Sequence, residues 1–177
     1  MEIKIRQQES TAAQPFLLPD STWDQSNFYA DWKIAGTTET GNIGGLQSLY
    51  GLQTAVILCL FTWKRAEDYE LAKFDGNDPK GWWGDAVDLQ DHETELGSKL
   101  WLLLRSVLND NTAVLAKTYA VESLQSLIAQ KVVAKIEVDA EVDIPNSRLD
   151  LRVRLYSEDG TTKYDQKFEK IWRQIYP

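Results

Sequence analysis

The sequence is poor in the residues from which nucleophilic and zinc sites are built. It contains one cysteine, Cys59, and one histidine, His92. A single cysteine excludes an internal disulfide. With only one cysteine and one histidine, the usual nucleophilic triads and a zinc centre made of these residue types are not supported. Cys59 lies in an apolar run and is interpreted as a small core residue.

Phosphate-binding and calcium-binding loops also lack support. The glycine-rich stretch GNIGG is too short for a phosphate loop and has no lysine. Asp75, Asn77 and Asp78 lie close together, but Pro79 occupies the position where an EF-hand requires an oxygen donor. These residues are typical of an Asx-type turn. We therefore predict no metal, no cofactor and no catalytic residue.

Basic residues and long apolar runs are scarce as well. The 19 lysines and arginines are outnumbered by 27 aspartates and glutamates, which gives a formal net charge of −8. This balance argues against nucleic acid as the main partner. The run AVILCLF is far shorter than the roughly 20 residues of a membrane helix, and MEIKIRQQES lacks the apolar core of a signal peptide. We expect no membrane partner, and synthesis in the cytoplasm.

The length of 177 residues and the apolar content of 43% fit one packed domain. Residues 1–44 differ in pattern and predict an extended N-terminal arm. Within it, EIKIR alternates like a short strand with Ile3 and Ile5 on one side, and ADWKIAG indicates a second short strand. Residues 45–177 are expected to form a single α+β domain.

Helical periodicity dominates the first part of that domain. The apolar run near Cys59 predicts a helix, with a buried strand as the alternative. A second helix is predicted over residues 96–108 and a third over residues 112–130, with Asn111 as its cap. The long irregular stretch at 64–98 is of a length that is usually functional inside a compact domain.

Period-two alternation replaces helical periodicity in the last third. Two alternating runs flank the turn IPNS and predict an antiparallel pair that places Glu141 near Arg152 and Asp139 near Arg154. The fold class follows as α+β, with helices packed on a C-terminal antiparallel β-meander.

A third strand is expected to complete the meander. Asp159-Gly160 is a strong hairpin signal. It leads into a run in which Tyr164, Phe168 and Trp172 share the apolar face.

The stretch GWWGD, residues 81–85, is the most unusual part of the sequence. Gly81 and Gly84 allow backbone angles that direct Trp82 and Trp83 to different sides, one into the core and one toward a partner. Asp85 is expected to accept hydrogen bonds from nearby backbone donors.

Carbohydrate chemistry is the alternative interpretation of this loop. Tryptophans stack on sugar faces, and carboxylates act as the acid and base of glycoside hydrolysis. The carboxylates available for that role are Asp85, Asp88, Glu93 and Glu95.

The ordered motifs together resemble a known family. ADW, LQTAVILCLFTWKRA, DPKGWWGD, GSKLWLLLRS and AKTYAVESLQSLIAQ, followed by the alternating strands, resemble a small baseplate protein of Mu-like contractile-tail phages. That family is similar to the wider lysozyme-like wedge family, and the match covers residues 31–155. The wider family often has Glu-Pro-Arg before its first long strand. Here Val133-Ala134-Lys135 stands there, and Lys135 keeps a positive charge without the bidentate fork of arginine.

The resemblance implies a structural, non-enzymatic protein of the inner baseplate. Such a protein joins wedge subunits to the hub and tube and helps to initiate the contractile sheath, in several symmetric copies within the virion. Its sheath contacts are expected to form by strand exchange through EIKIR and the strand after Asp159-Gly160, and the alternative for each is an ordinary edge strand within one subunit. The expected interface residues are Ile3, Ile5, Trp82, Trp83, Asp85, Trp101, Lys135, Phe168 and Trp172. The alternative function is a glycan-binding or peptidoglycan-cleaving tail protein that uses the Trp and carboxylate loop.

Overall fold

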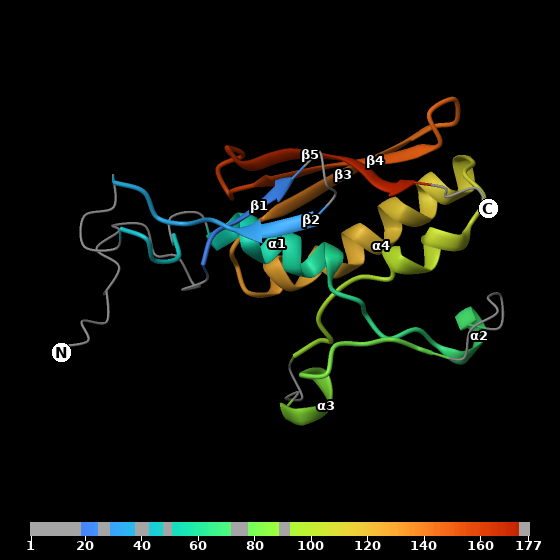
Figure 1. Ribbon diagram of the computed structural model, residues 1–177, viewed down its shortest axis with the longest axis horizontal. Coiled ribbons are helices and arrows are strands. Elements are labelled where there is room, and N and C mark those ends of the chain that lie inside the picture. Colours follow the sequence, from blue (N-terminus) through green and yellow to red (C-terminus); the bar gives the residue numbers. More distant parts are fainter. Residues whose placement is uncertain are drawn as a thin grey trace.

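The computed structural model describes residues 19–24, 29–37, 43–47, 51–71, 78–88 and 93–173. The side chains of Asp88, Arg105, Lys170, Trp172 and Arg173 lie outside this description. Figure 1 shows a curved antiparallel sheet lying on two helices, with a small hairpin at one end. The predicted α+β class is confirmed.

The sheet is a three-stranded meander in the order β3-β4-β5. Its strands are β3 (Lys135–Asp143), β4 (Arg148–Tyr156) and β5 (Thr162–Arg173), and each pair is antiparallel. Alternation places every second residue of the central strand β4 on the helix side. Buried there with at most 1% exposure are Leu149, Leu151, Val153 and Leu155.

Strands β3 and β4 pair antiparallel around the predicted turn IPNS, with Asp143 opposite Arg148. In this turn the backbone N–H of Asn146 donates to the side chain of Asp143. The prediction that Asp139 lies near Arg154 is confirmed, because the two form an ion pair; the contact is diagonal, since Arg154 lies directly opposite Glu137. Glu141 lies opposite Asp150, and the guanidinium of Arg152 pairs with Asp165 on β5 instead.

Helix α1 (Gly51–Phe61) confirms the helical interpretation of the apolar run. Val56 and Leu60 are fully buried, and Cys59 is 7% exposed, as predicted for a core residue. Because apolar residues surround this helix on most sides, it forms the centre of the core rather than a surface layer.

Helix α4 (Asp110–Ala129) packs against β3 beneath the sheet (Figure 1). The predicted stripe is confirmed at Ala116, Ala120, Leu124 and Leu127, which are buried. The cap is Asn109, not Asn111. Asn109 has extended backbone angles, and its side chain accepts a hydrogen bond from the backbone N–H of Thr112 at 3.0 Å.

The helix predicted over residues 96–108 is instead the short 3₁₀ helix η1 (Leu100–Arg105). Its buried residues Leu100, Leu102 and Leu103 explain the apolar spacing. The helix does not extend toward the N-terminus because Gly97 has a φ of 103° and Ser98 bridges Trp63. Tertiary pairing therefore overrides the local helical pattern.

Described parts of the predicted arm form the hairpin of β1 (Ser21–Asp24) and β2 (Tyr29–Trp32). Ile34 continues this region through an antiparallel bridge to Leu46, so the strand expected in ADWKIAG is present over part of its length. EIKIR lies outside the described residues. The boundary between arm and domain at residues 44 and 45 stays a prediction.

Strand β1 packs on α1 rather than standing free. The ring of Trp23 stacks on Phe61 with a centroid distance of 4.6 Å and meets the edge of Phe168 at 5.9 Å. The hydroxyl of Thr54 accepts a hydrogen bond from the backbone N–H of Ser21 at 2.9 Å and donates to the carbonyl of Pro19. Across the described ranges, no helix combines the length and apolar character needed to cross a bilayer.

Candidate interaction site

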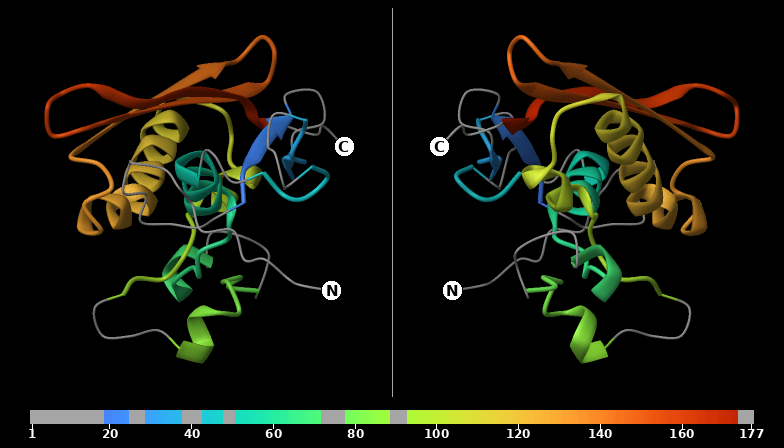
Figure 2. Two further views of the ribbon diagram at one scale, coloured as in Figure 1. Left: turned by 90° about the vertical axis from the view of Figure 1, so that its left-hand side faces the viewer. Right: turned by 90° about the vertical axis from the view of Figure 1, so that its right-hand side faces the viewer.

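The described parts of residues 63–99 leave the body of the molecule between α1 and η1, and we call residues 63–99 the projecting segment. Its described parts include α2 (Asp68–Leu71) and α3 (Asp85–Asp88). Both lie on the side of the helices that faces away from the sheet, and the side views agree (Figures 1 and 2). The long irregular stretch at 64–98, which the sequence indicated as functional, therefore projects from the body of the molecule on the side opposite the sheet.

The two ends of the projecting segment are joined at its base. Ser98 donates its backbone N–H to the carbonyl of Thr62 at 2.9 Å and accepts from the N–H of Lys64 at 3.0 Å. The Ser98 hydroxyl donates to the carbonyl of Leu60, at the end of α1. A Cβ at Gly97 would collide with the Thr62 carbonyl, so glycine is required for the two strands to approach this closely.

Aromatic and backbone contacts hold the first part of the segment. The indole N–H of Trp101 donates to the carbonyl of Lys64 at 2.9 Å, and Ala66 donates to the carbonyl of Pro79. The ammonium of Lys80 lies 4.5 Å from the centroid of the Trp63 ring, a cation–π contact. These contacts join the outgoing and returning parts of the chain.

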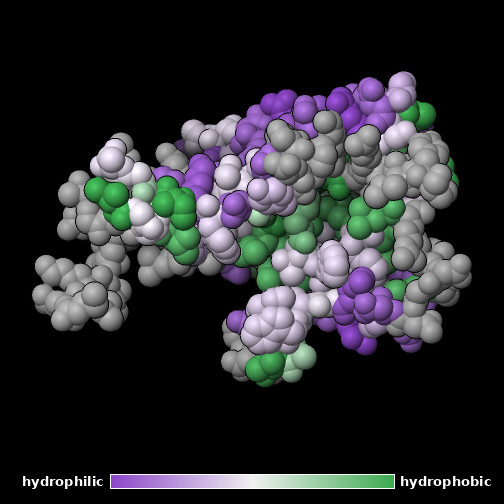
Figure 3. All heavy atoms as spheres, viewed as in Figure 1, coloured by the Kyte–Doolittle hydropathy of each residue, from purple (hydrophilic) through white to green (hydrophobic). Residues whose placement is uncertain are grey.

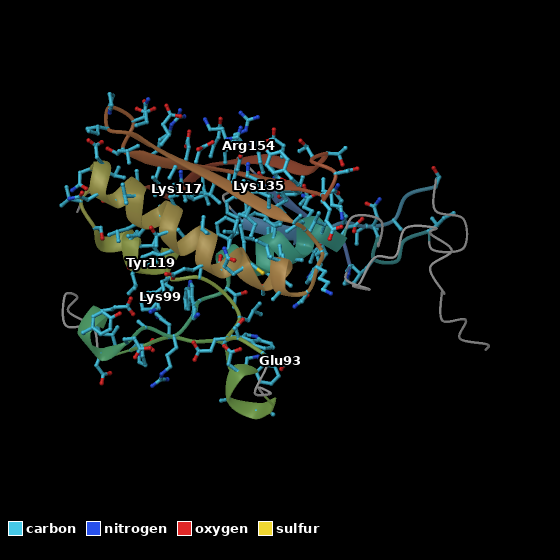
Figure 4. The ribbon with its side chains drawn as sticks, turned by 180° about the vertical axis from the view of Figure 1, so that it is seen from behind. Glu93, Lys99, Lys117, Tyr119, Lys135 and Arg154 are labelled. Carbon is cyan, nitrogen blue, oxygen red and sulfur yellow. The ribbon has the colours of Figure 1, made fainter. Side chains whose placement is uncertain are left out.

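A largely buried ion pair fixes α2 to the base. The ammonium of Lys99 lies 2.7 Å from the carboxylate of Glu70, and their side chains are 15% and 10% exposed. Desolvation lowers the pKa of Lys99, but the hydrogen bond and charge of Glu70 outweigh it, so the pKa is raised overall. Burial, then the charge of Glu70, raises the pKa of Tyr119 on α4, and Figure 4 shows Tyr119 near Lys99.

The GWWGD stretch forms the tip of the projecting segment. Trp82 lies over Gly84, where a Cβ would collide with its ring. The rings of Trp82 and Trp83 are 5.5 Å apart and tilted by 47°. Trp83 is 75% exposed and Val87 is 72% exposed. We call the group Trp82, Trp83 and Val87 the knob.

The prediction that one tryptophan enters the domain core is wrong. Trp82 is 40% exposed, and it packs on the local backbone at Gly84 instead. Asp85 behaves as expected for a backbone acceptor, because one carboxylate oxygen accepts the N–H of Leu96 at 3.1 Å. This bond joins α3 to the returning chain, so the same loop presents Trp83 and fixes its position.

Negative charge is concentrated in the projecting segment. Residues 63–99 contain ten acidic and five basic residues, which gives a net charge of −5 within the −8 of the whole chain. Glu93 lies beside α3 (Figure 4). Asp78 accepts a hydrogen bond from the backbone N–H of Lys80, which is the Asx-type turn expected from the sequence. In the described part of the chain, no cluster of three or more metal-ligating side chains occurs.

The other expected interface residues fall in different surroundings. Phe168 is fully buried between Trp23 and Phe61, so it contributes to the core rather than to the surface. Lys135 is exposed and pairs with Glu137 at 2.7 Å. Trp101 is half-buried beneath the projecting segment. Ile3, Ile5 and the side chain of Trp172 lie outside the described residues.

Sequence reasoning missed a second exposed apolar surface, which is formed by β2 of the N-terminal hairpin and by the bridged region of Ile34 and Leu46 that follows it. Figure 3 shows apolar residues gathered at that end of the molecule. The alternation in ADWKIAG, which places Trp32 and Ile34 on the same side of a strand, was the available signal. Exposed by 46% to 66% are Tyr29, Trp32, Ile34, Ile43 and Leu46.

Comparison with known proteins connects this geometry to a family. A family model described as "Phage protein GP46" matches residues 52–162, from α1 to the start of β5. The chain belongs to the phage protein GP46 family. The matched range contains the whole projecting segment of this GP46 family member, including the knob.

Two relatives extend the comparison. "Baseplate protein gp46" of Escherichia phage Mu is 36% identical over 135 residues, which cover 74% of this chain and 90% of that protein. "Mu-like prophage FluMu protein gp46" of Haemophilus influenzae is 31% identical over 126 residues, which cover 68% and 78%. These findings confirm the resemblance to baseplate proteins of Mu-like phages.

Proposed function

We propose that this GP46 family member is a structural component of a phage tail baseplate. The observation that carries the proposal is the knob, a firmly held group of large apolar side chains presented to solvent in a chain with a relative named as a baseplate protein. Exposed tryptophan at a fixed position is typical of an interface anchor. The chain then resides in the tail of the virion and is made in the host cytoplasm.

The finer role is that of an inner wedge protein. It links neighbouring wedge subunits to the hub and tube and helps to initiate the contractile sheath, in several symmetric copies. Among the described strands, β3 and β5 form the two edges of the main sheet and offer backbone groups for strand addition. Strand exchange through β5 and EIKIR is the contact we propose for the first sheath ring.

The same geometry supports a role without catalysis. Asp85, the carboxylate nearest the tryptophans in sequence, already accepts the backbone N–H of Leu96. It therefore serves to hold the loop. The glycan-binding or glycan-cleaving alternative predicts saturable binding or turnover of peptidoglycan that is lost in the Asp85→Asn or Glu95→Gln variant.

Assembly in the parent phage tests the proposal. Deletion of the gene is expected to remove normal contractile tails, as seen by electron microscopy. Trp83→Ala is expected to fold normally, because the side chain is 75% exposed, and to lose at least tenfold in incorporation into tails. Normal tails after deletion contradict the baseplate role.

A matched variant separates the knob from general loss of apolar surface. Val114 on α4 is 63% exposed, and Val114→Ala removes apolar area away from the projecting segment. It is expected to incorporate like the wild type. Equal incorporation of Trp83→Ala and the wild type would exclude the knob as an interface while leaving the baseplate role open.

A further inference from the structure

The chemistry of the knob defines the surface that it fits, and this inference rests on the proposed baseplate role. Trp83 and Val87 are four residues apart in a helical turn, whose N–H groups at Ala86 and Val87 donate to the carbonyls of Trp83 and Gly84. Their side chains are 75% and 72% exposed at the tip of the projecting segment. The apolar group is therefore a protrusion, and a protrusion is buried only by a concave partner.

The position of the protrusion is set before any partner binds. Gly97 and Ser98 close the base, Asp85 holds Leu96, and the Glu70–Lys99 pair holds α2. A surface fixed in this way loses little conformational entropy on binding, so more of the gain from burying Trp83 becomes affinity.

Charge narrows the partner further. The projecting segment carries a net charge of −5, and Glu93 lies beside α3 (Figure 4). An apolar protrusion on a segment of net negative charge, with Glu93 beside it, is complementary to an apolar socket whose rim is basic. The same charge opposes an anionic membrane surface and a nucleic-acid backbone. It also opposes docking of the knob against the projecting segment of a second copy, because both segments carry a net charge of −5.

We infer that the knob inserts into an apolar socket rimmed by Lys or Arg on a different protein of the tail. Trp83 fills the socket, Val87 seals one side of it, and Glu93 faces the basic rim. The partner is defined by this chemistry: a folded protein with an apolar depression and a positive border.

Cross-linking inside assembled tails tests the inference. Position 83 is replaced with the photoreactive aromatic p-benzoylphenylalanine, tails are irradiated, and the linked peptide is identified by mass spectrometry. The expected product joins position 83 to another tail protein, at apolar residues flanked by Lys or Arg. A link to a second copy of this chain, a link to an acidic surface, or no link in tails that contain the chain overturns the inference.

Charge reversal supplies a second readout with a matched control. Glu93→Lys and Asp68→Lys change the net charge equally, but Glu93 lies beside α3 and Asp68 lies on α2. Each variant is co-expressed with the wild-type chain, and their ratio is measured in tails and in the lysate. Glu93→Lys is expected to be depleted roughly 2- to 5-fold in tails, as for an exposed charge pair, and Asp68→Lys is not.

The outcomes distinguish this inference from the proposed function. Equal depletion of the two lysine variants, or no depletion of Glu93→Lys, would contradict the inference that the partner's socket has a basic rim. If the wild-type chain is missing from purified tails, the baseplate role itself fails.

Discussion

Gly97 occupies the point at which the projecting segment re-enters the body. Its φ of 103° is unfavourable for any other residue, and a Cβ would meet the Thr62 carbonyl. Gly97→Ala is therefore expected to lower the free energy of unfolding by about 2 kcal/mol or more. Urea unfolding followed by circular dichroism measures the change.

Gly36 provides the comparison for that substitution. It is exposed, and a Cβ there would have no atom within 4 Å. Gly36→Ala is expected to change the free energy of unfolding by less than about 0.5 kcal/mol. Equal effects of the two variants would show that the close approach at Thr62 does not constrain residue 97.

Tyr164 gives the folded chain a dependence on alkaline pH. Burial raises the pKa of its phenol above the ordinary value of 10.0, and its hydroxyl donates to Gln166. The unfolded chain loses this proton near pH 10, whereas the folded chain retains it. The stability from Tyr164 is thus complete below about pH 10 and is lost as the pH rises further. Urea midpoints at pH 8 and 11 are expected to differ less in Tyr164→Phe than in the wild type, and equal differences would contradict this.

At the level of the single residue, sequence reasoning predicted the local role of a side chain better than its tertiary contacts. It recognised Asp85 as a backbone acceptor and Cys59 as a core residue, because both roles follow from local pattern. It placed a GWWGD tryptophan in the core because glycine freedom does not specify direction. The burial of Phe168 followed from alternation, but its contact with Trp23 joins segments that no local pattern relates.

The outer face of the sheet carries ion pairs of unequal burial. Asp150 on β4 is 3% exposed and lies 2.9 Å from the ammonium of Lys167. Asp165 on β5 is exposed, and both of its carboxylate oxygens accept from Arg152. When an exposed ion pair is broken, water solvates the remaining group, so little stability is lost. When a buried ion pair is broken, water does not replace the lost partner in the same way, so the loss of stability is larger.

Two alanine substitutions test this difference. Asp150→Ala is expected to lower the free energy of unfolding by about 1–3 kcal/mol, since it leaves the partly buried guanidinium of Arg148 and the ammonium of Lys167 without the carboxylate that they share. Asp165→Ala is expected to have a clearly smaller effect. Guanidinium would screen the pairs, so urea unfolding at low salt is the measurement, and a larger loss in Asp165→Ala would contradict the ranking.

At the level of elements, periodicity predicted the class of structure and tertiary contacts decided the rest. The alternation of β3 and β4 and the stripe of α4 were correctly predicted, because each buries one continuous face. The class of η1 was not, because the bridge between Trp63 and Ser98 determines where this helix begins. This constraint is not encoded in the spacing of apolar residues.

At the scale of the whole molecule, the knob and the apolar surface at the N-terminal hairpin come from different parts of the chain. Ile34, which follows β2 of the hairpin, is 63% exposed, and such surface favours association of the isolated chain. Ile34→Thr keeps a β-branched residue and is expected to reduce self-association in sedimentation velocity without lowering the urea midpoint. Unchanged association would show that the hairpin does not mediate it.

The ordered motifs, rather than composition, led from sequence to family at the scale of the chain. Composition removed disulfide, zinc and nucleic-acid chemistry from consideration but did not indicate assembly. The order of GWWGD and the flanking helical motifs indicated the family that the comparisons later confirmed. Which neighbours the chain meets is a property of other proteins as well, so no pattern within this chain determines it.

The adjacency of Thr62 and Ser98 also has an evolutionary consequence. Because the chain departs and returns at one hydrogen-bonded step, insertions or deletions between these residues leave the spacing of α1 and η1 unchanged. Natural variation can therefore lengthen, shorten or replace the intervening residues while the scaffold is inherited intact. Replacement of the segment between Thr62 and Ser98 can therefore change which partner the protein binds while the rest of the fold is retained.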